Sequence, residues 1–241
     1  MTELRYLPDA DDVTTFTATV TEATQEYVVL EGTYFYPEGG GQPADRGTLE
    51  WDGGRATVGN VRKDHGEVRH DLESLEGEPP EPGTTVEGTI DAERRRDLSR
   101  MHTAQHVVSR LVLEEFGATT AGNQIHVDRS RIDFEPADFD GDDLERIQRL
   151  SNEAIESDYA VTKADRPRDA VEAAVDEGRS LLEMIPDHVD PLRVVDIEDF
   201  DMCPCGGTHV DRLGEIGRIE ITDRTSKGEN VERLEFELRD S

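Results

Sequence analysis

The sequence is poor in lysine and cysteine and has no long apolar run. Only three of its 26 basic residues are lysines, Lys63, Lys163 and Lys227. Its two cysteines, Cys203 and Cys205, are separated by one residue, which is too close for a disulfide framework. No segment approaches the ~20 apolar residues of a membrane span, and no basic region followed by an apolar run opens the chain. We therefore expect a cytoplasmic protein in a reducing compartment, with no membrane partner.

Acidic residues are in large excess. The chain has 56 Asp and Glu residues against 26 Lys and Arg, which gives a formal net charge of -30. With so few lysines, this composition is typical of a halophilic protein. In molar salt the Debye length shrinks to about 3 Å, so repulsion among carboxylates is screened. We expect the melting temperature to rise between about 0.1 M and about 3 M KCl, and an unchanged melting temperature would contradict this.

The first 90 residues show a pattern of short strands separated by turns. Strands are predicted at 13–21, 27–31, 47–51, 56–62, 67–72 and 84–90, and the proline- and glycine-rich stretch 76–84 is predicted to be an exposed loop. Many short strands with frequent glycine predict a small β-barrel.

Near Asp91 the apolar period changes from two to about 3.6 residues. A helix is predicted to start at a cap, Asp91 or Asp97, and to end at Phe116 before Gly117. Its apolar stripe comprises Leu98, Met101, Ala104, Val108, Leu111 and Val112. Further helices are predicted at 142–157 and 167–178, and strands at 125–134, 192–197, 217–222 and 231–238. The fold class is therefore α+β, with a barrel domain at 1–90 and an antiparallel sheet packed against helices at 91–241.

Two pairs of potential metal ligands lie about a hundred residues apart. His102 and His106 are four residues apart on one face of the predicted helix, at the edge of its apolar stripe, where we expect a groove wall. Cys205 and His209 enclose two glycines and a threonine. Either pair alone is explained by packing or by a glycine turn. Together they predict one tetrahedral zinc site, because imidazole and thiolate suit this ion. The zincin protease pattern is absent, since no glutamate follows His102.

These motifs resemble a known family. The segments 100–106 (RMHTAQH) and 205–209 (CGGTH) are similar to the paired motifs of the alanyl-tRNA synthetase editing domain, and the free-standing AlaX-type proteins match best. The stretch 36–47 (YPEGGGQPADRG) is similar to the glycine-rich stretch of the medium-length members, and 131–134 (RIDF) to another family segment. One departure is 120–123, which reads TAGN where the synthetase often has QKGS.

The resemblance implies an aminoacyl-tRNA deacylase, a hydrolase that acts on tRNA charged by another enzyme. Its expected substrate is alanine tRNA carrying serine or glycine, and whether glycine is removed is left open, as is the oligomeric state. Four protein ligands would close a tetrahedral zinc ion. Either one ligand, for example His209, is displaceable, or the terminal hydroxyl of the tRNA shares the chemistry. We favour three firm ligands and a labile fourth.

Other residues are candidates for substrate or tRNA contacts. Thr103 either contacts the substrate hydroxyl or only fills the helix. Asp133 and Arg131 either position water or the terminal adenosine, or form an ion pair on a strand. The remaining candidates are Gly39, Gly40, Gly41 and Gln42, which could equally form a plain β-turn, and Arg94, Arg95 and Arg96, which contact phosphates or balance nearby carboxylates.

Two rival functions remain at this point. One is a zinc-stabilised RNA-binding module without catalysis, and the other is a threonyl-type editing deacylase that shares the two metal pairs. The glycine-rich stretch 39–47 favours the alanine type.

Overall fold

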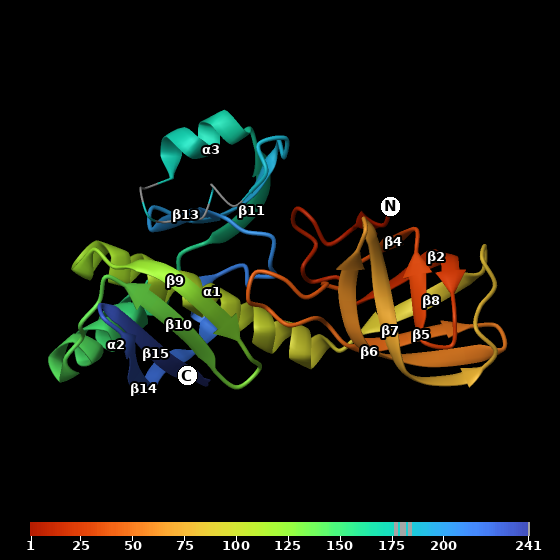
Figure 1. Cartoon of the computed structure of the whole chain (residues 1–241), viewed down its shortest axis with the longest axis horizontal. Helices are drawn as coiled ribbons and strands as arrows, with labels where there is room; N and C mark the ends of the chain where they lie inside the picture. The colour runs from red at the N-terminus through yellow and green to blue at the C-terminus, as the bar shows by residue number, and fades with distance from the viewer. Residues whose placement is uncertain (176–177, 179–181, 183–184, 241) are drawn as a thin grey trace. The chain divides into compact units, whose positions relative to one another are not determined.

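The computed structural model describes residues 1–175, 178, 182 and 185–240. The chain divides into two compact units, Met1–Arg96 and Asp97–Ser241. The α+β class predicted from the sequence is confirmed, since a closed β-barrel is followed by helices and antiparallel sheets (Figure 1).

The first unit is built around a six-stranded barrel, as predicted. Its strands are β2 (Thr15–Ala23), β3 (Tyr27–Leu30), β5 (Gly47–Trp51), β6 (Gly54–Asp64), β7 (Glu67–Gly77) and β8 (Thr85–Ile90). They close in the order β2-β3-β7-β6-β5-β8, with every neighbouring pair antiparallel. Two short strands, β1 (Glu3–Leu4) and β4 (Gly32–Thr33), pair in parallel. The predicted loop 76–84 is wrong at its start, because Glu76 and Gly77 still pair with β6.

The barrel core follows from the alternation along its strands. In β8 the side chains at Val86 and Ile90 are buried between exposed neighbours. Gly88 lies between them, and a Cβ atom there would come within 2.6 Å of the Phe16 ring. A glycine is therefore required for the aromatic ring to enter the barrel at this level.

A histidine lies in this core without contact to solvent. His70 on β7 is completely buried, with Nδ1 3.0 Å from the Val28 carbonyl and Nε2 2.9 Å from the Thr33 hydroxyl. The Thr33 oxygen also accepts the Phe35 amide. Neutral His70 satisfies these contacts when Nδ1 donates to Val28 and Nε2 accepts from Thr33. Burial lowers the pKa of His70 to about 4.

Acidification should therefore destabilise the barrel. Between pH 6.5 and about 4 an unfolded His70 takes up a proton that the folded one does not, so the free energy of unfolding falls through this window, by roughly 3 kcal/mol at its lower end. The variant His70→Asn keeps an amide donor for Val28 and does not titrate. Its unfolding, followed by the fluorescence of Trp51, should depend less on pH over this range than that of the wild type. Parallel pH profiles would contradict the assignment.

The second unit begins within a long helix. Helix α1 (Ala92–Phe116) starts after Asp91, whose carboxylate accepts the Arg94 amide at 3.1 Å, and ends at Gly117 with φ of +68°. Asp91, not Asp97, is therefore the cap. The predicted stripe of apolar residues on α1 is buried as expected. Helix α2 (Gly141–Glu156) begins at a capping box made by Asp140 and Asp143.

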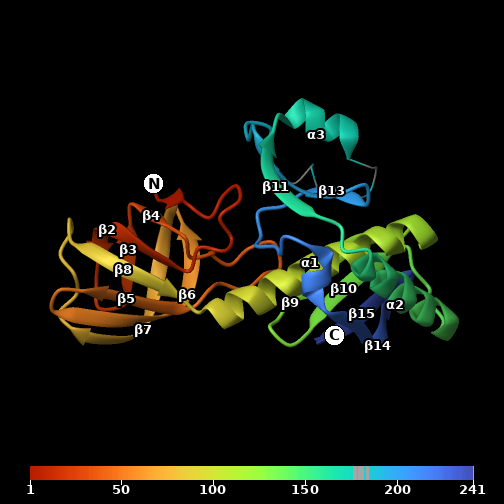
Figure 2. The ribbon, with the colours of Figure 1, turned by 180° about the vertical axis from the view of Figure 1, so that it is seen from behind.

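Two antiparallel sheets complete this unit. The four-stranded sheet has the order β14-β15-β10-β9, from β9 (Thr119–Ile125), β10 (Ser130–Glu135), β14 (Arg218–Gly228) and β15 (Val231–Arg239). Helices α1 and α2 share its apolar core and lie beside it in Figures 1 and 2. The three-stranded sheet, β11 (Val161–Arg166), β12 (Leu192–Ile197) and β13 (Asp201–Pro204), packs one face into that core and the other against α3 (Arg168–Ala174).

Three sequence predictions in this unit need correction. The single strand at 125–134 is a hairpin of β9 and β10, turned at residues 126–129. Strands β11 and β13 were not predicted, because they are short and owe their order to pairing with β12. The helix predicted at 167–178 ends at Ala174, and residues 176–177 of that prediction lie outside the described part of the chain. Among the described residues, no helix has the length and apolarity to cross a membrane.

Candidate metal centre

Helix α1 brings His102 and His106 to one face, one turn apart. Their side chains are 3% and 6% exposed. The expected position on an open groove wall is therefore wrong. The reason is tertiary, because the loop that follows β13 covers this face of the helix and carries the second pair of ligands.

That loop is fixed by its own contacts. One nitrogen of the buried Arg193 side chain on β12 donates to the carbonyls of Cys205 and Gly207, at 2.7 and 2.8 Å. The Cys205 amide donates back to the Arg193 carbonyl. The Gly207 amide lies 3.4 Å from the Cys205 sulfur, in the position of an N–H donor to a thiolate. The sequence folds into this loop because a buried guanidinium satisfies its carbonyl groups.

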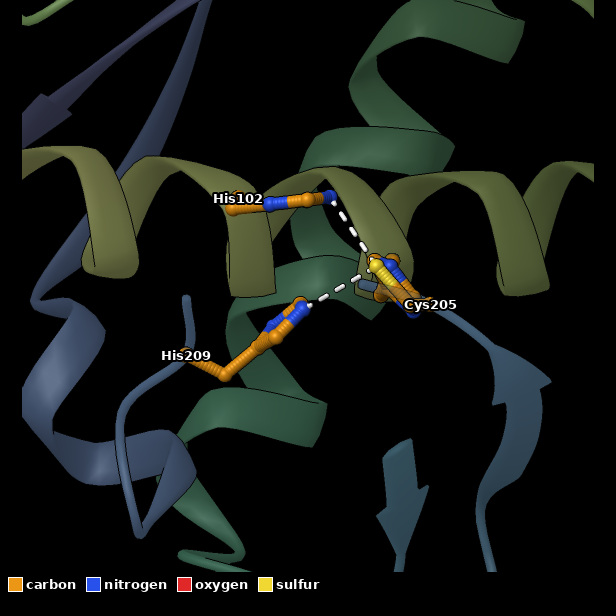
Figure 3. A group of neighbouring side chains, drawn as sticks. His102, Cys205 and His209 are labelled. Atoms are coloured by element: carbon orange, nitrogen blue, oxygen red, sulfur yellow. Dashed lines mark hydrogen bonds between the residues drawn. The ribbon is translucent and has the colours of Figure 1, made fainter. Parts of the chain in front are cut away.

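The four predicted ligands meet at one point. Their potential ligand atoms all lie within 4.8 Å of one another. The Cys205 Sγ is 3.5 Å from His102 Nε2 and 3.3 Å from His209 Nε2, and Figure 3 shows both rings pointing at the sulfur. Nitrogen and sulfur ligands of one tetrahedral zinc ion are separated by about 3.4 to 3.6 Å. The donor set and its spacing therefore fit a bound metal ion, and Cys203 on β13 is outside this set.

The electrostatics of the cluster also favour metal binding. Burial opposes ionisation of the Cys205 thiol, but His102 and His209 together hold its pKa well below the usual range. Burial, reinforced by His102, lowers the pKa of His209 well below its usual range, although Cys205 opposes this. A thiolate beside a neutral imidazole is the protonation state that a metal ion requires.

The hydroxyl of Thr103 is engaged by protein groups. Its side chain is fully buried between the ligands of α1, and its hydroxyl contacts Nδ1 of His209 at 3.1 Å. The predicted contact with a substrate hydroxyl is therefore not supported, because the hydroxyl already has protein partners. Sequence reasoning also missed Asp201, whose buried carboxylate lies 3.8 Å from Nδ1 of His106. In the sequence, the only indication of a role for Asp201 was its position four residues before Cys205.

Asp133 and Arg131 lie on the wrong face for catalysis at this centre. Their neighbours Ile132 and Phe134 point into the core with α1, so Asp133 and Arg131 lie on the opposite face of the sheet. Asp133 accepts two hydrogen bonds from Arg233, at 2.6 and 2.8 Å, which lower its pKa. Arg131 donates to Gln124. The ion-pair alternative describes Asp133 better than the predicted catalytic role.

The three consecutive arginines differ in their surroundings. Arg95 is 3% exposed and pairs with the fully buried Asp45, so it has no surface for a phosphate. Arg94 is half-buried and donates to the Ala44 carbonyl. Arg96 is exposed and stays a candidate for a phosphate contact.

The glycine-rich stretch forms a tight turn at the surface of the first unit. The amide of Gly39 donates to the Gln42 carbonyl and the Gln42 amide to the Gly39 carbonyl, at 3.1 and 2.9 Å. Gly40 and Gly41 have φ of +57° and +83°, which only glycine adopts freely. Gly39 and Gly40 are exposed, whereas Gln42 is buried. The β-turn alternative is therefore observed, and it presents rigid backbone to solvent.

Comparison with known families matches two regions of the chain. Residues 9–94 match the model of class II (A) tRNA synthetases. Residues 192–235, which include Cys205 and His209, match the model described as the second additional domain of threonyl and alanyl tRNA synthetases.

Whole-chain relatives decide the family. The alanyl-tRNA editing protein AlaX-M of Methanosarcina acetivorans is 36% identical over 100% of both chains. That of Methanosarcina mazei is 36% identical over 100% of this chain and 98% of its own. The chain belongs to the alanyl-tRNA editing protein family. The family resemblance read from the motifs is confirmed, and so is the enzyme class, since members of this family are aminoacyl-tRNA deacylases.

Similar sequences also occur within larger relatives. The alanine–tRNA ligase of Methanopyrus kandleri is 41% identical over 87% of this chain, which corresponds to 23% of the ligase. The similarity to a synthetase therefore concerns one part of that enzyme.

Proposed function

We propose that this protein hydrolyses the ester bond of alanine tRNA mischarged with serine or glycine, at a zinc ion held by His102, His106, Cys205 and His209. The observation that supports this most directly is the group of four ligand atoms, three of them from buried histidines, in a chain whose full length aligns with alanyl-tRNA editing proteins. The substrate is tRNA charged by another enzyme, because the relatives of full length are editing proteins and not ligases.

The residues of the centre would bind the zinc ion and orient the ester. Three imidazoles and one thiolate hold the ion, and burial of the three histidines keeps water from competing for them. Cys205 alone of the four remains partly exposed, so the ester approaches from its side. With one ligand position open, bound zinc would polarise a carbonyl or lower the pKa of a water molecule to about 7, whereas with all four protein ligands in place it would organise the pocket.

The surroundings of His209 bear on the choice between a displaceable ligand and help from the tRNA. The Nδ1 atom of His209, which faces away from the Cys205 sulfur, contacts Thr103, and Cys205 is fixed by the contacts of its loop. This argues against His209 as the displaceable ligand. Participation of the terminal tRNA hydroxyl requires no open ligand position, and the closed donor set supports that alternative better.

Contacts with tRNA must be short-range in so acidic a protein. At high salt, hydrogen bonds and stacking outweigh long-range attraction. The exposed Gly39 and Gly40 have no side chains, so a nucleotide can approach the backbone of the turn closely, and the exposed Arg96 carries a positive charge that attracts phosphate. We propose these as contact points on the first unit.

One assay tests the proposal. The purified protein at high salt is mixed with alanine tRNA charged with serine, glycine or alanine, and with threonine tRNA charged with serine, and ester loss is followed. We expect loss from the mischarged alanine tRNA alone, and elemental analysis should find zinc. Binding without ester loss would favour the non-catalytic module, and loss from the seryl-threonine tRNA would favour threonyl-type editing.

A further inference from the structure

The hydroxyl of Thr103 contacts three groups, all from protein. It donates to the Ser99 carbonyl at 2.9 Å, one turn earlier on α1. It accepts the Val210 amide at 3.3 Å. Its third contact is Nδ1 of His209, at 3.1 Å. The residue is fully buried, so these contacts are sheltered from solvent.

Counting hydrogens assigns the tautomer of His209. A threonine hydroxyl has one hydrogen to donate and two lone pairs. The Ser99 carbonyl can only accept and the Val210 amide can only donate. All three contacts are satisfied together only if His209 carries its proton on Nδ1 and donates it to Thr103. Nε2 is then left with a free lone pair, and this is the atom that points at the Cys205 sulfur.

A second hydroxyl on α1 supports the same loop. Ser99 lies four residues before Thr103, hence on the same face of the helix. Its hydroxyl donates to that of Thr208 at 2.8 Å. Both Ser99 and Thr208 are buried. Helix α1 thus binds residues 208–210 of the loop through two side chains that are not metal ligands, and these contacts help to orient His209.

We propose that Thr103 is a positioning residue for the metal centre, which fixes the Nδ1–H tautomer and the ring orientation of His209 so that Nε2 binds the ion. This inference rests on the proposed function insofar as that assigns zinc to the site. It replaces the role of substrate contact that the sequence indicated for Thr103. Partners of this kind, which hold the outer nitrogen of a ligand, typically contribute 10- to 100-fold to metal affinity.

The test compares two substitutions at Thr103 in the zinc-loaded protein. Thr103→Val has nearly the same shape but lacks the hydroxyl, whereas Thr103→Ser retains it. Transfer of zinc to a chromogenic chelator measures affinity. We expect about 10- to 100-fold weaker zinc binding for Thr103→Val and near wild-type binding for Thr103→Ser. Ser109→Ala, which removes another buried hydroxyl of α1, bonded to Thr120, is the matched control and should bind zinc as the wild type does.

A second readout is independent of tRNA. In nitrogen-edited NMR spectra of the zinc-loaded wild type, His209 should show a proton on Nδ1 that exchanges slowly with water, and the Val variant should lose this protection. Equal zinc affinity of the Val variant and the wild type, or a proton on Nε2 of His209, overturns the inference while the proposed function stands. If the Val variant loses affinity but the wild type cleaves no charged tRNA, the proposed substrate fails and the inference holds. A wild type that binds no zinc overturns both.

Discussion

A His106→Ala variant should lose its bound zinc and deacylate mischarged alanine tRNA more than about 100-fold more slowly than the wild type. The loss exceeds the 10- to 100-fold that removal of an outer partner costs, because a ligand atom itself disappears. His106 is 6% exposed, and its removal takes one of the four ligand atoms out of the group. Elemental analysis measures the loss of zinc, and single-turnover kinetics of ester loss measure the slower deacylation.

The control for this substitution is another histidine of the same unit. His188 is exposed and does not belong to the ligand group. His188→Ala should therefore keep both zinc and activity. If His106→Ala kept the wild-type rate, the metal centre would not be the site of hydrolysis.

The second large effect is expected at Asp45 in the barrel unit. Its carboxylate is fully buried, pairs with Arg95 and accepts the Tyr36 amide at 2.6 Å. Other donors of Arg95 bind the carbonyls of Asp11 and Tyr34, each at 2.7 Å. Asp45→Ala leaves a buried guanidinium without its counter-charge, which typically costs 3–5 kcal/mol. The free energy of unfolding, followed by Trp51 fluorescence at high salt, should fall by about that amount.

Two further variants make this prediction specific. Glu50 and Arg55 form an exposed ion pair in the same barrel, and Glu50→Ala should cost no more than about 1 kcal/mol. The double variant Asp45→Ala with Arg95→Leu removes both charges and should recover part of the lost stability. A loss for Asp45→Ala as small as that for Glu50→Ala would show that the pair does not hold the glycine-rich stretch to the start of α1.

Much of the barrel could be predicted because its evidence is local. Alternation of period two, interrupted by glycine and proline, places a strand without knowledge of its partner. The limits of β6 and β7 were missed, because the two neighbouring strands extend each other by pairing as one long hairpin. Strands β11 and β13 were missed for the same reason, since each is ordered by β12 between them.

The site was predictable in its ligands and not in their surroundings. Spacing alone put His102 and His106 on one face of a helix, and thiolate and imidazole chemistry joined them to Cys205 and His209. Each ligand histidine has one ring nitrogen that does not bind the ion. The hydrogen-bond partner of that nitrogen depends on where the loop after β13 crosses α1. We therefore assign Thr103 to the support of His209 and not to a substrate contact, because this crossing buries its hydroxyl.

The amino-acid sequence by itself determined the α+β class, the apolar stripe of α1 and the four metal-ligand candidates, because these depend on residue type and on spacing within a few turns. Tertiary structure alone decided which polar groups remain accessible. It turned Asp133 to the face of the sheet away from α1, buried Arg95 against Asp45, and placed Thr103 against His209. The physical reason is that burial and hydrogen-bond partners come from segments distant in sequence, and a side chain's chemistry changes with them.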